Sequence, residues 1–177
     1  MPIVKRLELP DFNALGKGIE ELLQRLPTIA GVVAVNFFQD RFNEGGWIDN
    51  SGFERWDDRK DPNANGSALL VSGFLKNAFD TKTGKGWVEI TNYAKYSATH
   101  NEGGIITIKV TKKARRYFWY MYKKTNDIRW KHMAITKKET FTMNIPKRQF
   151  MGHSAYLLER LDLNYKVQLN RLANKHF

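Results

Sequence analysis

The first quarter of the chain has the apolar spacing of an amphipathic helix. Apolar residues recur there every three or four positions, and glutamates occupy another face, which is typical of a helix packed against a core. The members of this stripe are Leu15, Ile19, Leu22, Leu23 and Leu26. Asp11 is of a type that caps helix N-termini, and Pro27 interrupts the stripe before a second helical stretch that ends at Gly45. Two helices or one kinked helix fit this pattern.

Residues 46–66 break the helical pattern and predict a long loop. Three aromatic residues, Trp47, Phe53 and Trp56, stand there among charged and polar residues. Loops of this length in a compact domain usually serve a function, so we expect Trp47 and Trp56 to dock onto the domain itself or onto a neighbour. Docking onto a neighbour would order a loop that is mobile in the monomer. The aspartates of the loop lack the spacing and central glycine of a calcium site, so we expect no metal; they are Asp57, Asp58 and Asp61.

Short helical and extended segments alternate through the rest of the chain. Ser72 is a candidate N-cap for a short helix over residues 74–79, and residues 81–86 read as a turn. Alternation of apolar and polar side chains predicts strands, and helical spacing returns from residue 157 to residue 172. The expected strands are residues 87–91, 106–110 and 141–145.

These elements predict an α+β fold in which a small antiparallel or mixed sheet is flanked by N-terminal helices and a C-terminal helix. The length of 177 residues fits a single domain with its own core. The expected parts are a helical region at about 10–45, a sheet core at about 67–150 with an insertion at about 111–135, and a C-terminal helix at about 153–174.

Residues 145–152 form the corner between the last predicted strand and the terminal helix. Pro146 fixes its own φ and has no N–H to donate, whereas Gly152 permits a sharp change of direction. Between these bends lie two cations, Lys147 and Arg148, and one large apolar side chain, Phe150. The corner is therefore a candidate docking point. The alternative is a plain connection in which the phenylalanine fills the core.

The composition excludes several classes of chemistry. The chain has no cysteine, so disulfides and thiolate catalysis are absent. No apolar run approaches the roughly 18–20 residues that cross a bilayer, and the first residues lack the apolar region of a signal peptide. We therefore expect neither a membrane span nor a leader.

The net charge of +11 is concentrated in the second half of the chain. Residues 1–104 contain 12 Lys and Arg against 14 Asp and Glu, whereas residues 105–177 contain 17 against 4. A basic half indicates nucleic acid, an acidic protein or an anionic surface as a partner. The alternative is a basic face that only water contacts.

The most basic stretch, residues 112–131, interleaves cations with aromatic residues. This composition suits nucleic-acid binding, in which cations hold phosphates and aromatic rings stack on bases. It also suits an oligomer interface, or an amphipathic helix that covers the sheet with Phe118. We prefer a helix that forms an interface, although the pattern leaves helix and strand open. The candidate nucleic-acid contacts are Arg115, Arg116, Trp119, Lys123 and Lys124.

The histidines give no catalytic or metal-binding pattern. His100 and Glu102 are close in sequence and invite an acid–base interpretation, but no nucleophile or third orienting residue stands at a recognisable spacing. The other histidines are scattered and lack metal-ligand spacing. We expect a structural His100 beside the turn formed by Gly103 and Gly104, with no enzymatic activity, cofactor or metal.

Several short stretches follow one another in an order that resembles a known family. They are an aromatic-glycine loop at 42–56, Leu69-Leu70-Val71-Ser72-Gly73-Phe74-Leu75-Lys76-Asn77, Tyr93-Ala94 with His100-Asn101-Glu102-Gly103-Gly104, and Ile145-Pro146-Lys147-Arg148-Gln149-Phe150-Met151-Gly152. This order resembles the phage virion morphogenesis family, the tail-completion proteins of Mu-like tailed phages and prophages. The last stretch reads Ile-Pro-Ala-Arg-Pro-Phe-Leu-Gly in that family, so Lys147 and Gln149 depart from it. The resemblance covers about residues 30–165 and does not include the aromatic-basic segment.

The resemblance implies a non-enzymatic structural protein of the virion. Such a protein completes the tail or neck and joins it to the head, as a homo-oligomeric ring around the channel through which DNA passes. Its partners would be other neck and tail proteins, and it would be assembled in the cytoplasm of the bacterial host. A nucleic-acid-binding protein that uses residues 112–131 is the alternative function; its affinity would fall steeply with salt.

The resemblance also implies roles for individual residues. Lys147 and Arg148 would present charge to a neighbouring subunit, and Phe150 would pin the corner. The expected interface residues are Lys147, Arg148, Phe150, Trp47 and Trp56. The residues expected to shape turns are Gly73, Tyr93, His100, Gly103, Gly104, Pro146 and Gly152.

Overall fold

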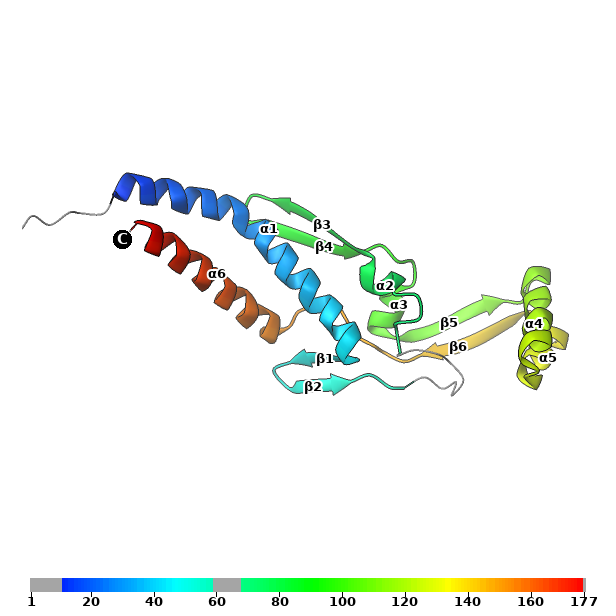
Figure 1. Cartoon of the computed structure of the whole chain (residues 1–177). Coiled ribbons are helices and arrows are strands. Elements are labelled where there is room, and N and C mark those ends of the chain that lie inside the picture. The colour runs from blue at the N-terminus through cyan, green and yellow to red at the C-terminus, as the bar shows by residue number, and fades with distance from the viewer. Residues whose placement is uncertain (1–10, 59–67, 177) are drawn as a thin grey trace, which may run out of the picture. The chain divides into compact units, whose positions relative to one another are not determined.

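The computed structural model describes residues 11–58 and 68–176 (Figure 1). It confirms the α+β class and divides the chain into two compact units. Unit 1 comprises Met1–Ser97 and Arg148–Phe177, and unit 2 comprises Ala98–Lys147. The predicted insertion at 111–135 lies inside unit 2, which begins earlier and ends later than the insertion.

Unit 1 begins with one long helix, α1 (Phe12–Glu44), which contains Pro27. The Asp11 carboxylate accepts hydrogen bonds from the backbone N–H groups of Asn13 and Ala14, both at 3.0 Å, as a helix cap does. Gly45 ends the helix in the left-handed conformation (φ 71°) that glycine adopts without strain. The ribbon changes direction along its length (Figure 1), as an internal proline causes. The kinked-helix alternative is therefore the correct one.

Two β-hairpins in unit 1 include segments that were predicted to be irregular, together with β4, which confirms the strand predicted at 87–91. β1 (Gly46–Asp49) pairs with β2 (Gly52–Arg55), so the first half of the predicted loop at 46–66 is a hairpin. Its later part, residues 59–66, lies outside the described residues. β3 (Phe79–Gly84) pairs with β4 (Trp87–Asn92), so the turn predicted at 81–86 is wrong except at its tip. The β3 side chains are mostly exposed and polar, which removes the apolar alternation that marks a strand.

A short helix and the C-terminal helix complete unit 1. α2 (Phe74–Asn77) is shorter than predicted, because Phe79 belongs to β3. α6 (Ala155–His176) runs antiparallel beside α1 (Figure 1) and agrees with the predicted terminal helix. Two buried clusters hold these elements together. The first contains Phe42, Trp56, Leu75, Ala78, Ala94 and Phe150, and the second contains Ala34, Phe37, Phe38, Trp47 and Leu157.

Unit 2 is a hairpin that carries a pair of helices. After α3 (Ser97–Glu102), β5 (Gly104–Lys109) pairs antiparallel with β6 (Thr140–Ile145), which confirms both predicted strands. α4 (Lys112–Thr125) and α5 (Ile128–Ile135) lie between these strands in sequence. The aromatic-basic segment is therefore helical. Among the described residues the strands form three separate two-stranded sheets and not one sheet, because each strand pairs with only one partner.

Candidate functional site

Phe150 is a core residue of unit 1. It is 1% exposed, and its ring centroid lies 4.9 Å from that of Phe42 and 6.2 Å from that of Phe79. The three rings come from the corner, from α1 and from β3, so Phe150 joins elements that are distant in sequence. Phe150 therefore fills the core, which was the alternative interpretation of the corner. Its side chain is not available to a neighbouring subunit.

Arg148 also turns inward and does not present its charge at the surface. Its side chain is 7% exposed, and its Nε and Nη2 donate hydrogen bonds to the Asp57 carbonyl at 3.2 and 2.9 Å. Nη2 also lies 3.3 Å from the Asp58 carbonyl. The guanidinium thus ties the chain beyond β2 to the corner. Of the two cations expected to face a neighbour, only Lys147 is exposed.

The two tryptophans dock onto unit 1 itself. Trp47 and Trp56 are each 6% exposed. Trp47 packs edge-on against Phe37 at 5.8 Å, and Trp56 Nε1 donates to the Gln149 carbonyl at 2.9 Å. Of the two alternatives for this segment, docking onto the domain itself is the one observed. The two tryptophans are therefore not available as interface residues, and a contact between subunits has to use other side chains.

The residues expected to shape turns fall into different structures. Gly73 precedes α2 in the left-handed conformation (φ 69°), whereas His100 lies within α3 and not in a turn. Gly103 follows α3 with φ 74°, and a Cβ there would come 2.8 Å from the Lys147 nitrogen. Only glycine fits this close backbone approach. Tyr93, by contrast, is 61% exposed before α3.

The remaining corner residues, Pro146 and Gly152, stand where the chain changes direction. Pro146 directly follows β6, which ends at Ile145, and its missing N–H removes a donor that would extend the ladder. Gly152 adopts φ 154° shortly before α6 begins, a conformation that favours glycine.

The start of α6 is fixed by two polar residues that the sequence analysis did not identify. Ser154 is fully buried; its Oγ donates to the Ile48 carbonyl at 2.8 Å and accepts from the Leu157 N–H at 3.3 Å. Asp49 accepts the Ala155 N–H at 2.8 Å. This hydrogen bond is the largest cause of the lowered pKa of Asp49, and a hydrogen bond from the Asn50 N–H is the next. A serine just before an apolar run was the available signal for a helix start.

We expect the Asp49 cap to make stability depend on acid pH. The pKa of Asp49 is lower in the folded state than in the unfolded state. The contribution of its carboxylate to stability is therefore complete at pH values above the unfolded-state pKa, and it is lost as the pH falls through the folded-state pKa. Asp49→Asn should therefore flatten the decline of Tm below about pH 4, measured by circular dichroism. Glu54→Gln, an exposed change on the neighbouring strand β2, is the control. Parallel curves for wild type and Asp49→Asn would contradict the expectation.

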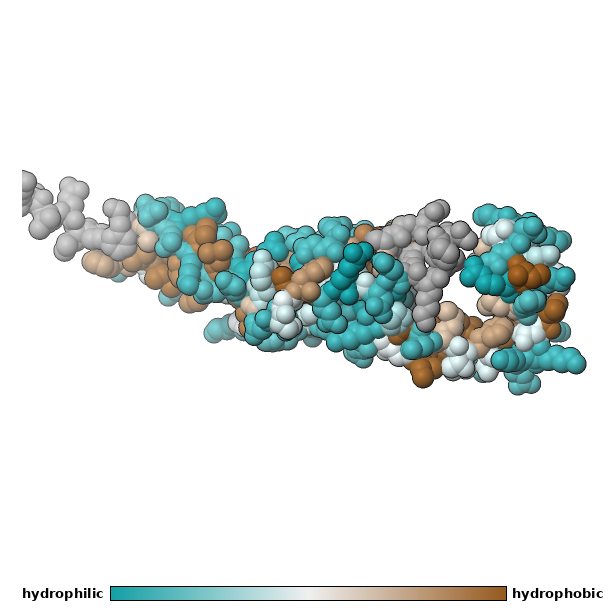
Figure 2. All heavy atoms as spheres, turned by 90° about the horizontal axis from the view of Figure 1, so that it is seen from below, coloured by the Kyte–Doolittle hydropathy of each residue, from teal (hydrophilic) through white to brown (hydrophobic). Residues whose placement is uncertain are grey.

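The α1–α6 pair leaves apolar side chains uncovered toward the end where α1 begins and α6 ends. The buried residues of α1 lie from Pro27 onward, whereas Phe12, Ile19 and Leu23 in its N-terminal half are 63%, 40% and 58% exposed. Exposed apolar side chains on α6 are Tyr156, Leu158, Leu163, Val167 and Leu169. Figure 2 shows brown apolar side chains interrupting the polar surface where this end of the helix pair lies. We call Phe12, Ile19 and Leu23 of α1, together with Leu163 and Val167 of α6, the apolar face.

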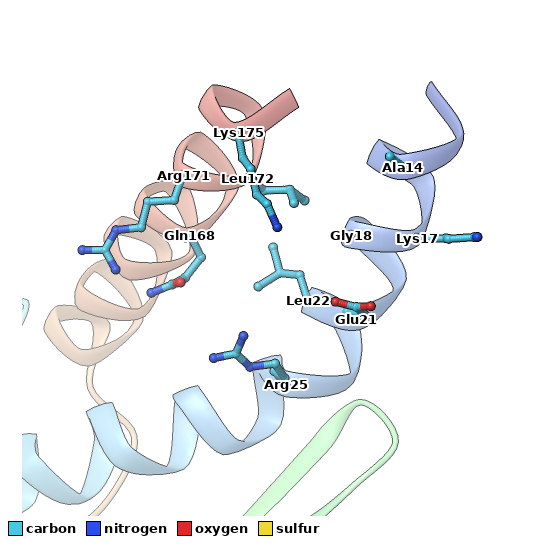
Figure 3. Close-up of a pocket in the computed structure, with 10 residues that line it drawn as sticks. All are labelled: Ala14, Lys17, Gly18, Glu21, Leu22, Arg25, Gln168, Arg171, Leu172 and Lys175. Carbon is cyan, nitrogen blue, oxygen red and sulfur yellow. The ribbon is translucent and has the colours of Figure 1, made fainter. Parts of the chain in front are cut away.

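A cleft separates the two helices at this end. It has a volume of about 400 Å³ and is lined by α1 from Ala14 to Arg25 and by α6 from Gln168 to Lys175. Leu22 and Leu172 point toward each other across the gap, while Lys17 and Arg171 point away from it (Figure 3). Leu22 and Leu172 are therefore only partly buried at this end of the helix pair.

Unit 2 contains the second candidate surface, on α4. Phe118 is 8% exposed; it stacks on Trp130 of α5 at 6.0 Å and meets Phe141 of β6 edge-on at 6.2 Å. Arg115 donates from Nη1 to the Ala134 and Thr136 carbonyls, so it holds the end of α5 and is not a surface contact. The other candidate nucleic-acid contacts are exposed: Arg116, Trp119, Lys123 and Lys124.

Across residues 11–58 and 68–176, no group of three or more His, Asp or Glu side chains is placed to hold a metal ion. None of the helices within those ranges is long and apolar enough to cross a membrane. Comparison with protein families, with curated proteins and with solved structures finds no match for this chain.

Proposed function

We propose that this chain is a non-enzymatic structural protein that assembles with copies of itself through the apolar face of α1 and α6, and that it completes the tail or neck of a tailed-phage virion. We infer assembly from the apolar side chains of α1 and α6 that no other described part of unit 1 covers. Large side chains such as Phe12, Leu23 and Leu163 are more than half exposed. Large apolar side chains left exposed along a helix in this way are typical of protein–protein contact sites.

The spacing of the exposed residues supports a helical contact. Phe12, Ile19 and Leu23 follow one another at intervals of seven and four residues, so they lie along one side of α1. Leu163 and Val167 have the same four-residue interval on α6. Ridges of this kind pack into the grooves of another helix. A neighbouring copy supplies such helices, and head-to-tail contacts that close produce a ring.

The virion assignment is supported by sequence. It rests on the ordered stretches at 69–77, 93–104 and 145–152, which resemble the phage virion morphogenesis family. In unit 1, the last stretch places Phe150 in the core and Arg148 against the Asp57 carbonyl. Its role in this proposal is thus to build the subunit, while the apolar face joins subunits. Neighbouring neck and tail proteins are the other proposed partners, and DNA passes through the ring.

Leu23→Asp is expected to weaken self-association strongly. A carboxylate in the centre of an apolar contact loses its hydration without gaining a partner, and a change of this kind at an interface centre weakens association by roughly 30-fold or more. Sedimentation velocity across a range of protein concentrations measures the effect. Val32→Asp is the matched control, because Val32 is 57% exposed on the same helix but nine residues away, on the opposite side.

The virion role is tested in a lysogen that encodes this chain. Deletion of the gene is expected to leave DNA-filled heads beside detached or malformed tails in electron micrographs. Complementation with Val32→Asp should restore joined particles, whereas Leu23→Asp should not. Normal virions from the deletion strain would exclude the morphogenesis role, and equal self-association of both variants would exclude the apolar face as the contact.

A further inference from the structure

We propose that the outer face of α4 in unit 2 is a binding site for nucleic acid, with a preference for unpaired bases. We define the outer face by its exposed cations and rings: Lys112, Lys113, Arg116, Lys123, Lys124, Tyr117, Trp119 and Tyr120. The inference is independent of the proposed assembly, since it concerns unit 2 alone and requires no second copy.

The charge of unit 2 is not neutralised within the fold. Residues 98–147 contain 12 Lys and Arg against 3 Asp and Glu, a net of +9 out of the +11 of the whole chain. α4 itself has no acidic residue. None of the five cations of the outer face forms an ion pair with another residue in the described ranges. Such a surface attracts polyanions, because neutralising phosphates releases their counterions.

The cations stand in a row along the helix. Lys112, Arg116 and Lys123 are separated by four and seven residues, so they project from the same side of α4 over about 17 Å. Trp119 lies in the same row, between Arg116 and Lys123. One strand of B-DNA carries a phosphate about every 3.4 Å along the axis, so a row of this length faces several phosphates of a single strand at once.

Exposed aromatic rings distinguish this face from a basic surface that only water contacts. Tyr120 is 58% exposed, Tyr117 is 52% exposed and Trp119 is 39% exposed, although α4 already buries Phe118 against α5. Rings beside cations match the way proteins hold single strands, where bases stack on aromatic side chains and cations follow the backbone. A protein partner fits less well, because four of the five cations are lysines, and lysine is depleted in protein–protein interfaces.

The helix is held in place by contacts on its inner side. The Phe118–Trp130 stack and the Arg115 hydrogen bonds to the last carbonyls of α5 join the two helices. Thr111 caps the start of α4 by accepting the Ala114 N–H at 3.1 Å. The outer residues therefore project from a fixed support, which reduces the conformational entropy lost on binding.

Fluorescence anisotropy with the full-length protein tests the site, using labelled 20-nucleotide single strands and the corresponding duplex. The triple variant Lys112→Gln, Arg116→Gln, Lys123→Gln is expected to bind single strands at least about tenfold more weakly and to reduce the salt slope by about 2. The control removes the same charge from exposed positions of unit 1: Lys82→Gln, Lys85→Gln, Lys95→Gln. It should leave the salt slope unchanged.

A second variant tests the aromatic contribution. Tyr120→Ala is expected to weaken single-strand binding about fivefold or more, whereas Tyr120→Phe keeps the ring and should bind as wild type. Far-UV circular dichroism checks that the variants retain their helices. Equal losses in the two triple variants, equal binding of polyglutamate, or no binding at 50 mM salt would overturn the site. Tighter binding to duplex with no effect of Tyr120→Ala would overturn the preference for unpaired bases.

Discussion

Phe150→Ala is expected to lower the free energy of unfolding by about 3–5 kcal/mol, a large part of the stability of a domain of this size. The residue is 1% exposed and its ring contacts those of Phe42 and Phe79. Truncation removes buried apolar surface and leaves a cavity between α1, β3 and the corner. Because these elements are distant in sequence, the surrounding rings have no local way to fill the space.

Urea unfolding followed by tryptophan fluorescence measures this loss as a lower midpoint at an unchanged slope. Phe74→Ala is the matched control: Phe74 is 47% exposed at the start of α2, and its truncation should cost roughly 1 kcal/mol or less. Similar losses for both variants would mean that the corner is not packed as described.

Arg148→Ala is expected to destabilise unit 1 by roughly 2–3 kcal/mol. The guanidinium donates to the carbonyls of Asp57 and Asp58, at distances between 2.9 and 3.3 Å, and truncation leaves these oxygens without that donor. Arg148→Lys should recover only part of the loss, because an ammonium cannot reproduce the planar fork of donors. Lys147→Ala, at the exposed neighbouring cation, should change stability by no more than about 0.5 kcal/mol.

The Arg148 variants also separate a structural role from an interface role. Chemical unfolding gives the stability, and sedimentation velocity gives the self-association of the folded protein. We expect Arg148→Ala to lose stability and, once folded, to associate as wild type. A variant with wild-type stability that no longer associates would instead show that the guanidinium acts on a neighbour.

The elements that the sequence predicted well are those whose signals are local. Asp11 and Gly45 mark the two ends of α1, and the alternation at 106–110 and 141–145 marks β5 and β6. Caps and side-chain periodicity depend on residues within a turn or two of one another, so they can be read without knowing the fold. The α+β class follows from these elements.

The tertiary structure decided which of several similar side chains turn inward. Arg148 is buried and Lys147 is exposed, just as Arg115 holds the end of α5 while Arg116 faces outward. The inward-turned Arg148 and Arg115 donate to carbonyls that stand 91 and 19 residues away in sequence. Two adjacent cations have nearly the same sequence around them. Only the position of the distant carbonyl therefore decides which of the two turns inward.

Long-range packing also explains the errors in the predicted loop and sheet. Trp47 and Trp56 lie in polar surroundings in the sequence but are buried against α1 and the corner, and β3 lacks apolar alternation because most of its side chains are exposed. Strand pairing joins two segments, and the sequence of one segment does not show which other segment it pairs with. The sequence by itself thus determined the limits of α1, the class and the basic, aromatic character of α4. Only the tertiary structure determined the pairing of the strands, the division into two units and the side chains left on the surface, because these depend on contacts between distant residues.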